Sequence, residues 1–260
     1  MITEYISEEE HYEKYLVQEY LNNRTRKFPS QMKEDFLNQE EIDIINYYWH
    51  HPKRKHFLDT SMVPIQQEIL NDKTVDRTAE YNVFSDLYNN PWWAGLKQIL
   101  YPKVRAWLGE DIWIPHCHVL DSRYPYGIHT DAQQKGFKHA PHPAWTIIVP
   151  LEDYNSKTYV FNEPSVFKQP DEHVEKSHNL DWTEIEKNDM CVSEEVFVKD
   201  FEALGTQRRW LKLLTVDGTF PWKAGRAICS DRYKLHGSDN YYNYGISNKR
   251  ALIMWTTHSG

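Results

Sequence analysis

The spacing of apolar residues changes character near residue 110 of this chain of 260 residues. Before that point apolar positions recur at helical spacing behind recognisable starts. Capping boxes or an N-terminal proline predict three of these starts, at Ser7 with Glu10, at Asn38 with Glu41, and at Asn90-Pro91. Gly109 is the predicted end of the third helix.

After residue 110 the chain becomes a series of short β-branched and apolar runs separated by Pro and Gly. The predicted strands are 112–120, 145–151, 158–161, 227–229 and 251–257. A more polar stretch lies between Pro164 and Pro221, and it contains one predicted helix from Ser193 to Leu204. We interpret this stretch as an insertion or lid between core strands.

Helices followed by a run of strands indicate an α+β domain with a mainly β core. The predicted form is a cupin-like jelly roll, with the N-terminal helices packed on one sheet. The length suits one domain over residues 1–260. Within it we expect a helical N-terminal part at 1–110 and a jelly-roll core at 111–260, with the insertion at 164–221.

Composition narrows the function. The formal net charge of −8 disfavours nucleic acid, which needs a basic face. Three cysteines give no disulfide framework, and neither a signal peptide nor an apolar run of membrane-spanning length is present. We therefore expect a cytoplasmic protein with no membrane partner; nothing in the sequence indicates its oligomeric state.

Histidine followed two residues later by a carboxylate occurs three times, at His11, His129 and His173. His11 lies in a helical pattern, where side chains two residues apart point to nearly opposite sides. His173 lies in the polar stretch, without an apolar scaffold. His129 and Asp131 lie in a strand-and-turn context, and side chains two apart on a strand share one face. This pair is predicted to share a metal ion; the alternative is a pair of turn-capping residues.

A facial metal triad needs one more histidine, distant in sequence and on a neighbouring strand. His236 fits, because it follows a turn, a predicted strand and a short loop. Arg250 then opens a strongly apolar strand.

This set of residues resembles the 2-oxoglutarate- and Fe(II)-dependent oxygenases, nearest their phytanoyl-type and prolyl-hydroxylase-type branches. The motifs are His129-x-Asp131, His236-Gly-Ser-x-Asn240 and Arg250 at the head of a strand. The run from Trp145 to Glu152 is similar to the family's strand after the His-x-Asp turn. The resemblance covers roughly residues 112–258.

The resemblance implies a double-stranded β-helix in which His129, Asp131 and His236 bind Fe(II). It also implies a basic residue that pairs with the distal carboxylate of 2-oxoglutarate. Arg250 is the predicted residue, because a guanidinium binds a carboxylate through two parallel hydrogen bonds. Lys249 is the alternative, since only one of two strand neighbours faces inward.

A hydroxyl group is also expected on that carboxylate, from Tyr124 or, alternatively, from Ser238. The implied activity is a dioxygenase that uses Fe(II), 2-oxoglutarate and O2 to hydroxylate a small molecule or a peptide side chain. No catalytic residue beyond the metal ligands is predicted. Because relatives that halogenate lack the carboxylate ligand, the presence of Asp131 favours hydroxylation.

Two other functions fit the same fold. The chain can be a cupin-type metalloprotein that does not use 2-oxoglutarate, or a binding module of jelly-roll form without catalysis. His116 and His118 share one strand face and are interpreted as a packed or hydrogen-bonded pair rather than metal ligands. His139 and His142 belong either to a loop at the substrate entrance or to the ordinary surface.

Overall fold

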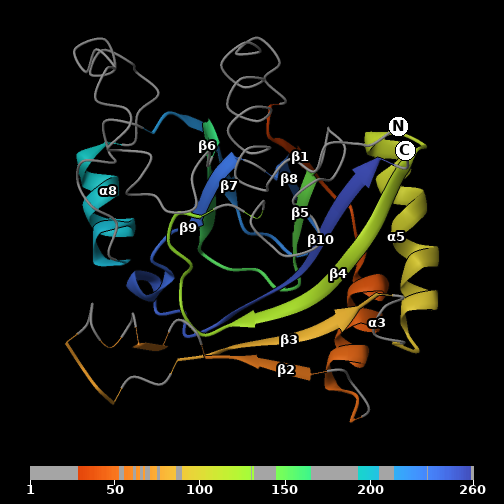
Figure 1. The fold of residues 1–260 in the computed structure, drawn as a ribbon, viewed down its shortest axis with the longest axis horizontal. Coiled ribbons are helices and arrows are strands. Elements are labelled where there is room, and N and C mark those ends of the chain that lie inside the picture. The colour runs from red at the N-terminus through yellow and green to blue at the C-terminus, as the bar shows by residue number, and fades with distance from the viewer. Residues whose placement is uncertain are drawn as a thin grey trace, which may run out of the picture.

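The computed structural model describes residues 29–52, 56–60, 63–64, 67, 71–74, 77–85, 90–129, 131, 145–164, 193–204, 214–232 and 234–258. These residues form two antiparallel sheets with few helices (Figure 1). The mainly β, antiparallel architecture predicted from the sequence is therefore confirmed. In the described part of the chain, no helix has the length and apolar character needed to cross a membrane.

The larger sheet has seven strands in the order β1-β8-β5-β10-β4-β3-β2. Their bounds are β1 Gln31–Lys33, β2 His56–Asp59, β3 Ala79–Phe84, β4 Ile112–Ser122, β5 Trp145–Pro150, β8 Ala227–Asp231 and β10 Lys249–His258. The long strands β4 and β10 pair from Ser122 with Lys249 to Ile112 with His258, and they run side by side as two curved arrows in Figure 1.

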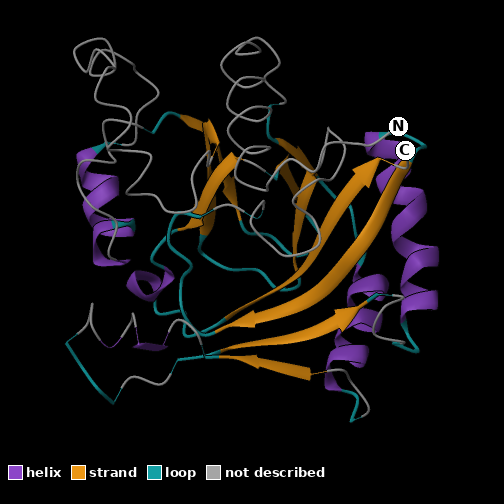
Figure 2. Ribbon diagram, viewed as in Figure 1, coloured by secondary structure: helices purple, strands orange, loops and turns teal. Residues whose placement is uncertain are grey.

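The smaller sheet has the order β7-β6-β9, with β6 at Lys157–Pro164, β7 at Val216–Pro221 and β9 at Lys234–Ser238. Beside it lies the short helix α8, Glu194–Asp200, followed by the 3-10 turn η3, Glu202–Leu204 (Figure 2). Phe197 and Phe201 of this segment share a buried cluster with Tyr159 and Phe161 of β6. The Ser193 hydroxyl caps α8 as predicted, by accepting from the Val196 N–H.

Two longer helices, α3 at Gln39–His50 and α5 at Trp93–Leu108, belong to the main hydrophobic core. Asn38 and Glu41 form the predicted capping box of α3. The buried faces of α3 and α5 share one cluster with alternate residues of the larger sheet, such as Leu252 and Met254 of β10. Because side chains alternate along a strand, the intervening residues of the sheet point to its other face.

The strands expected after residue 110 are all present, most of them longer by one or more residues. The interpretation of residues 1–110 as helical needs correction, because β1, β2 and β3 lie within it and extend the larger sheet at both edges. These strands are short and form by pairing with segments distant in sequence, as β3 does with β4. The residues of the strands themselves therefore show no pattern that predicts a strand.

The interpretation of residues 164–221 as an insertion also needs correction. Residues 216–221 form β7, a strand of the smaller sheet, whereas 165–192 and 205–213 lie outside the described residues. The helix predicted behind Ser7 also lies outside them. The third helix begins at Trp93 rather than at Pro91, because Asn90 accepts from the Trp92 N–H in a turn that precedes it. A helix η5, Tyr241–Tyr244, joins β9 to β10.

Candidate metal and co-substrate site

A cavity of about 420 Å³ is lined by residues of both sheets. The larger sheet presents alternate residues to it from its two longest strands, namely His116, His118, Leu120 and Ser122 of β4, and Lys249, Ala251, Ile253 and Trp255 of β10. The smaller sheet contributes Thr158, His236 and Ser238. The face of the larger sheet opposite the α3–α5 cluster is therefore a wall of the cavity.

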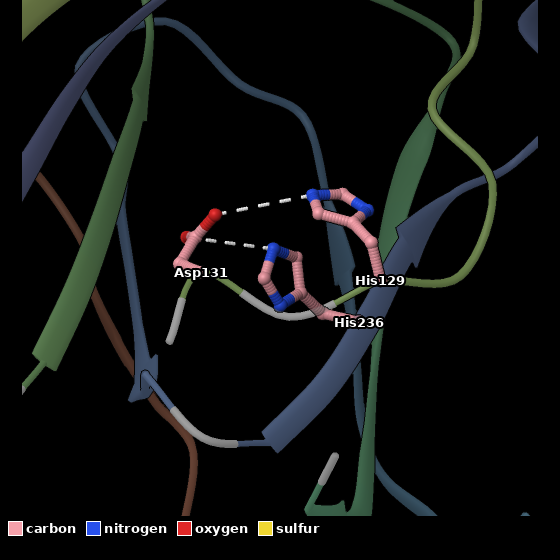
Figure 3. Close-up of side chains that lie close together, drawn as sticks. All are labelled: His129, Asp131 and His236. Carbon is pink, nitrogen blue, oxygen red and sulfur yellow. Dashed lines mark ion pairs between the residues drawn. The ribbon is translucent and has the colours of Figure 1, made fainter. Parts of the chain in front are cut away.

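His129, Asp131 and His236 converge on one point in this cavity (Figure 3). Their ligating atoms all lie within 4.8 Å of one another. The Asp131 carboxylate oxygens lie 4.0 Å from His129 Nε2 and 3.6 Å from His236 Nε2. Of all the described histidines, cysteines and acidic residues, these are the only ones that form such a group.

The backbone fixes the two histidines relative to each other. His129 lies in the loop after β4 and forms an isolated antiparallel bridge with His236 of β9. Each of the two residues donates its N–H to the carbonyl of the other, and both hydrogen bonds are 2.9 Å long. His236 lies on a strand, as expected, whereas His129 forms a single bridge in place of the strand expected there.

Hydrogen bonds also orient both rings. His129 Nδ1 lies 2.7 Å from the Gly127 carbonyl oxygen, and His236 Nδ1 lies 3.2 Å from the Lys234 carbonyl oxygen. Because a carbonyl oxygen only accepts, each Nδ1 carries a proton, and in the neutral ring this leaves the lone pair on Nε2. This is the arrangement in which a histidine presents Nε2 to a metal ion.

Asp131 is held from two sides. Its Oδ2 accepts a 2.7 Å hydrogen bond from the Thr146 hydroxyl of β5, and its main-chain carbonyl accepts from the buried Arg232 guanidinium at 3.2 Å. Neither supporting residue is predicted from the sequence. Thr146 is a polar residue inside an apolar strand, which is the signal that identifies it; no comparable pattern marks Arg232.

The protonation states suit a cation. Desolvation, reinforced by His236, lowers the pKa of His129 to about 4. Burial acts to raise the pKa of Asp131, but the charges of His236 and His129 and the Thr146 hydrogen bond outweigh it, so the pKa of Asp131 is lowered. At neutral pH His129 is a neutral imidazole and Asp131 a carboxylate. Two imidazole nitrogens and one carboxylate form the donor set typical of non-haem Fe(II).

Lys249, and not Arg250, faces the cavity. The Arg250 guanidinium lies on the opposite face of β10, where it donates two hydrogen bonds to Asp121 and lies over the Trp49 ring of α3. Arg250 and Asp121 are direct cross-strand partners. Because side chains alternate along a strand, Arg250 points away from the cavity and cannot contact a co-substrate there. The geometry favours the alternative, Lys249.

The Lys249 ammonium is buried and is held by hydrogen bonds and an aromatic ring. It donates 2.8 Å hydrogen bonds to the hydroxyls of Ser156 and Ser238, and it lies 3.7 Å from the centre of the Trp222 ring. The buried Asp239 carboxylate is 3.9 Å away. Burial lowers the pKa of Lys249 to about 7, although Asp239 acts in the opposite direction.

Tyr124 also lines the cavity, and its side chain is buried. Its hydroxyl makes no hydrogen bond to the described residues. Burial raises its pKa, so the group is an uncharged donor. Ser238, the other hydroxyl weighed from the sequence, lines the same cavity and already contacts Lys249.

The interpretation of His116 and His118 as a hydrogen-bonded pair is confirmed, because His116 Nε2 lies 3.0 Å from His118 Nδ1. His139 and His142 lie outside the described residues, as do His11 and His173.

No protein-family model matches this chain, and no curated protein sequence matches it. Solved structures do match. The 2-oxoglutarate-dependent non-haem epimerase SnoN of nogalamycin biosynthesis superposes with a TM-score of 0.52 at 12% identity, over 94% of this chain and 84% of its own. A 2-oxoglutarate–Fe(II) oxygenase-family oxidoreductase from Burkholderia pseudomallei gives 0.50 at 10% identity, over 90% and 88%. The chain shares the fold of these enzymes. The resemblance seen in the sequence is thus confirmed at the level of the fold.

Proposed function

We propose that this protein is an Fe(II)- and 2-oxoglutarate-dependent dioxygenase that hydroxylates a small molecule or a peptide side chain. The convergence of His129, Asp131 and His236 within a cavity of an oxygenase-type fold carries the proposal. The two Nε2 lone pairs and the Asp131 carboxylate would hold the iron. When bound, iron and 2-oxoglutarate supply the oxidising power that activates O2 for attack on a C–H bond.

The rest of the site suits 2-oxoglutarate. Side chains two apart on a strand share a face and are roughly 7 Å apart, so Ser238 lies on the same side of β9 as His236. Lys249 is hydrogen-bonded to Ser238. A dicarboxylate with one end near the metal can therefore place its other end on the Lys249 ammonium, with Tyr124 as a further donor. We propose Lys249 and Tyr124 as the co-substrate residues in place of Arg250.

Two alternatives predicted from the sequence are less well supported. A cupin-type site that does not use 2-oxoglutarate has no need of a buried ammonium in the same cavity. A binding module without catalysis has no need of two histidines whose Nδ1 protons are directed away from a shared carboxylate. The Lys249 ammonium lines the same cavity as His129, Asp131 and His236, which supports the binding of an anion such as 2-oxoglutarate between them.

We also propose that helices α3 and α5 brace the larger sheet, which their shared core cluster supports. A cytoplasmic location is part of the same proposal. Its support is the acidic composition and the two buried free thiols, Cys117 and Cys229.

The decisive experiment needs no knowledge of the substrate. Metal-free protein is titrated with Fe(II) and then 2-oxoglutarate without O2, and the visible charge-transfer band of the chelated Fe(II)–2-oxoglutarate complex is recorded. We expect a saturable band in the wild type and none in His129→Ala. Exposed His50, at the end of α3, provides the matched control, and His50→Ala should keep the band. A folded wild type without the band would refute the proposal.

A further inference from the structure

The cavity continues beyond the metal triad along strands β2, β3 and β4. This part is walled by aromatic rings, and its polar groups include a histidine and a carboxylate. The lining residues that matter here are Phe57, Asp59, Tyr81, His118 and Trp255. None of them belongs to the proposed metal or co-substrate residues, so their chemistry bears on the primary substrate.

The His118 ring is fixed in place. Its Nδ1 is hydrogen-bonded to His116 Nε2 at 3.0 Å, and its ring centre lies 5.4 Å from those of both Tyr81 and Trp255. His116 is itself stacked on Trp255 at 4.5 Å. The other nitrogen of His118, Nε2, has no hydrogen-bond partner among the described residues, and the ring lines the cavity. A polar atom held this rigidly at a cavity wall is suited to contact a ligand.

The polar groups of this part of the cavity lie next to the proposed metal ligands. The hydroxyls of Tyr81 and Tyr126 are 2.6 Å apart, and the Tyr126 ring centre lies 5.6 Å from that of His129. One of the two hydroxyls donates to the other, and Tyr81 also interacts with the Asp59 carboxylate, so a hydrogen-bonded group of side chains borders the cavity here. A molecule bound against His118 and Tyr126 therefore lies next to the proposed iron.

The charges of this region disfavour an anion. Among the lining residues that the structure describes, Lys249 is the only lysine or arginine, and the proposed co-substrate occupies it. Burial lowers the pKa of His116 to about 4 and that of His118 well below its usual range, so both are neutral near pH 7. Asp59 adds a carboxylate to this part of the cavity. Among the described side chains that line the cavity, a substrate carboxylate or phosphate would find no positive partner other than Lys249.

We infer that His118 Nε2, positioned by the hydrogen bond between the His118 and His116 rings, binds an uncharged hydroxyl or carboxamide group of a ring-bearing primary substrate. The ring would pack between the aromatic walls, and the hydroxyl or amide would contact His118 and the tyrosine hydroxyls. This inference rests on the proposed function, because it assigns the primary-substrate end of the same cavity. It predicts that anionic analogues of such a substrate bind more weakly.

Size-matched probes test the inference without the natural substrate. Benzamide, benzoate and benzylamine differ in charge and share one ring. Their dissociation constants are measured by calorimetry on protein loaded with Fe(II) and 2-oxoglutarate without O2. We expect the wild type to bind benzamide about tenfold more tightly than either charged probe, since leaving a buried polar group unpaired costs roughly this factor.

Variants then locate the contact. His118→Phe keeps a ring but removes both nitrogens, and it should abolish the preference for benzamide, whereas His118→Gln, which keeps a polar atom near Nε2, should restore part of it. His116→Phe should reduce the preference through loss of positioning, and His50→Phe should leave it unchanged.

The charge-transfer band is recorded for every variant. Where the band is intact, a wild type without a preference for benzamide, or a His118→Phe variant that keeps the preference, overturns the inference and leaves the proposed function standing. If His118→Phe does not fold, the same decision is made on His118→Gln and His116→Phe, which must each show a reduced preference. Loss of the band in the wild type instead removes the proposed function.

Discussion

Lys249 and Arg250 are adjacent in the chain and lie on opposite faces of β10, with the ammonium in the cavity and the guanidinium paired with Asp121 on the other side. Of these two cationic side chains, only Lys249 can therefore contact a ligand in the cavity. It also provides a matched pair of variants, because the two residues are neighbours on one strand and both are basic.

We expect Lys249→Met to weaken 2-oxoglutarate binding by about a hundredfold, as lost charge-assisted hydrogen bonds cost roughly 3 kcal/mol. Arg250→Met should leave that affinity within about twofold and lower the free energy of unfolding by about 1 kcal/mol through loss of the Asp121 pair. Titration of the charge-transfer band measures the first effect, and urea unfolding measures the second. The reverse pattern would return the co-substrate role to Arg250.

The affinity for 2-oxoglutarate should depend on pH. Burial lowers the pKa of Lys249 to about 7, so the ammonium that binds a carboxylate is present below pH 7 and is lost as the pH rises above it. We expect affinity to fall by up to about tenfold per pH unit above pH 7. Dissociation constants from pH 6 to 9 test this, with Lys249→Arg as the comparison, because a guanidinium stays charged throughout. A wild type with pH-independent affinity would contradict the assignment.

Thr146→Val should weaken metal binding by about tenfold to a hundredfold, the usual effect of removing a group that orients a metal ligand. The substitution keeps the side-chain shape and removes the 2.7 Å hydrogen bond to Asp131 Oδ2. Competition with a chelator measures the affinity, and Thr219→Val, at an exposed position on β7, is the control. Equal affinities for both variants would mean that Asp131 is oriented by other contacts.

Acid should destabilise the metal-free protein because His116 and His118 resist protonation in the folded state. The folded-state pKa of His116 is about 4 and that of His118 is well below normal, against about 6.5 in the unfolded chain. The unfolded state therefore binds more protons, and stability is lost as the pH falls from 6.5 toward 4, by on the order of 1 kcal/mol per pH unit for each group. Urea unfolding at pH 7, 6, 5 and 4 tests this. His116→Phe should flatten the dependence, and an unchanged slope would exclude the pair as its source.

The sequence predicts β4, β5, β6, β8 and β10, because their β-branched runs and their Pro and Gly turns are local features, but it does not predict β7 or β9. It also predicts that His129, Asp131 and His236 lie close together, as the structure has them, and their role as metal ligands remains a prediction. It does not predict β1, whose polar residues Gln31–Lys33 become a strand only through pairing with β8. Long-range pairing of this kind leaves no periodicity in the chain itself.

The choice between Lys249 and Arg250 illustrates the same limit at the site. Side chains alternate along a strand, so only one of the two can face the cavity. Which one does so depends on the register of β10 with β4 and β5. The support of Asp131 by Arg232 is likewise a contact between residues far apart in sequence. Such contacts follow from the assembled fold and cannot be inferred from spacing.

The reciprocal backbone hydrogen bonds between His129 and His236 have a consequence for metal exchange. The two histidines are joined through their main chains, so the fold itself sets their separation. Much of the ordering entropy of metal binding is therefore spent when the protein folds. In the proposed function, iron would leave and return without refolding of the chain, so the metal content of the protein would follow the local supply of iron.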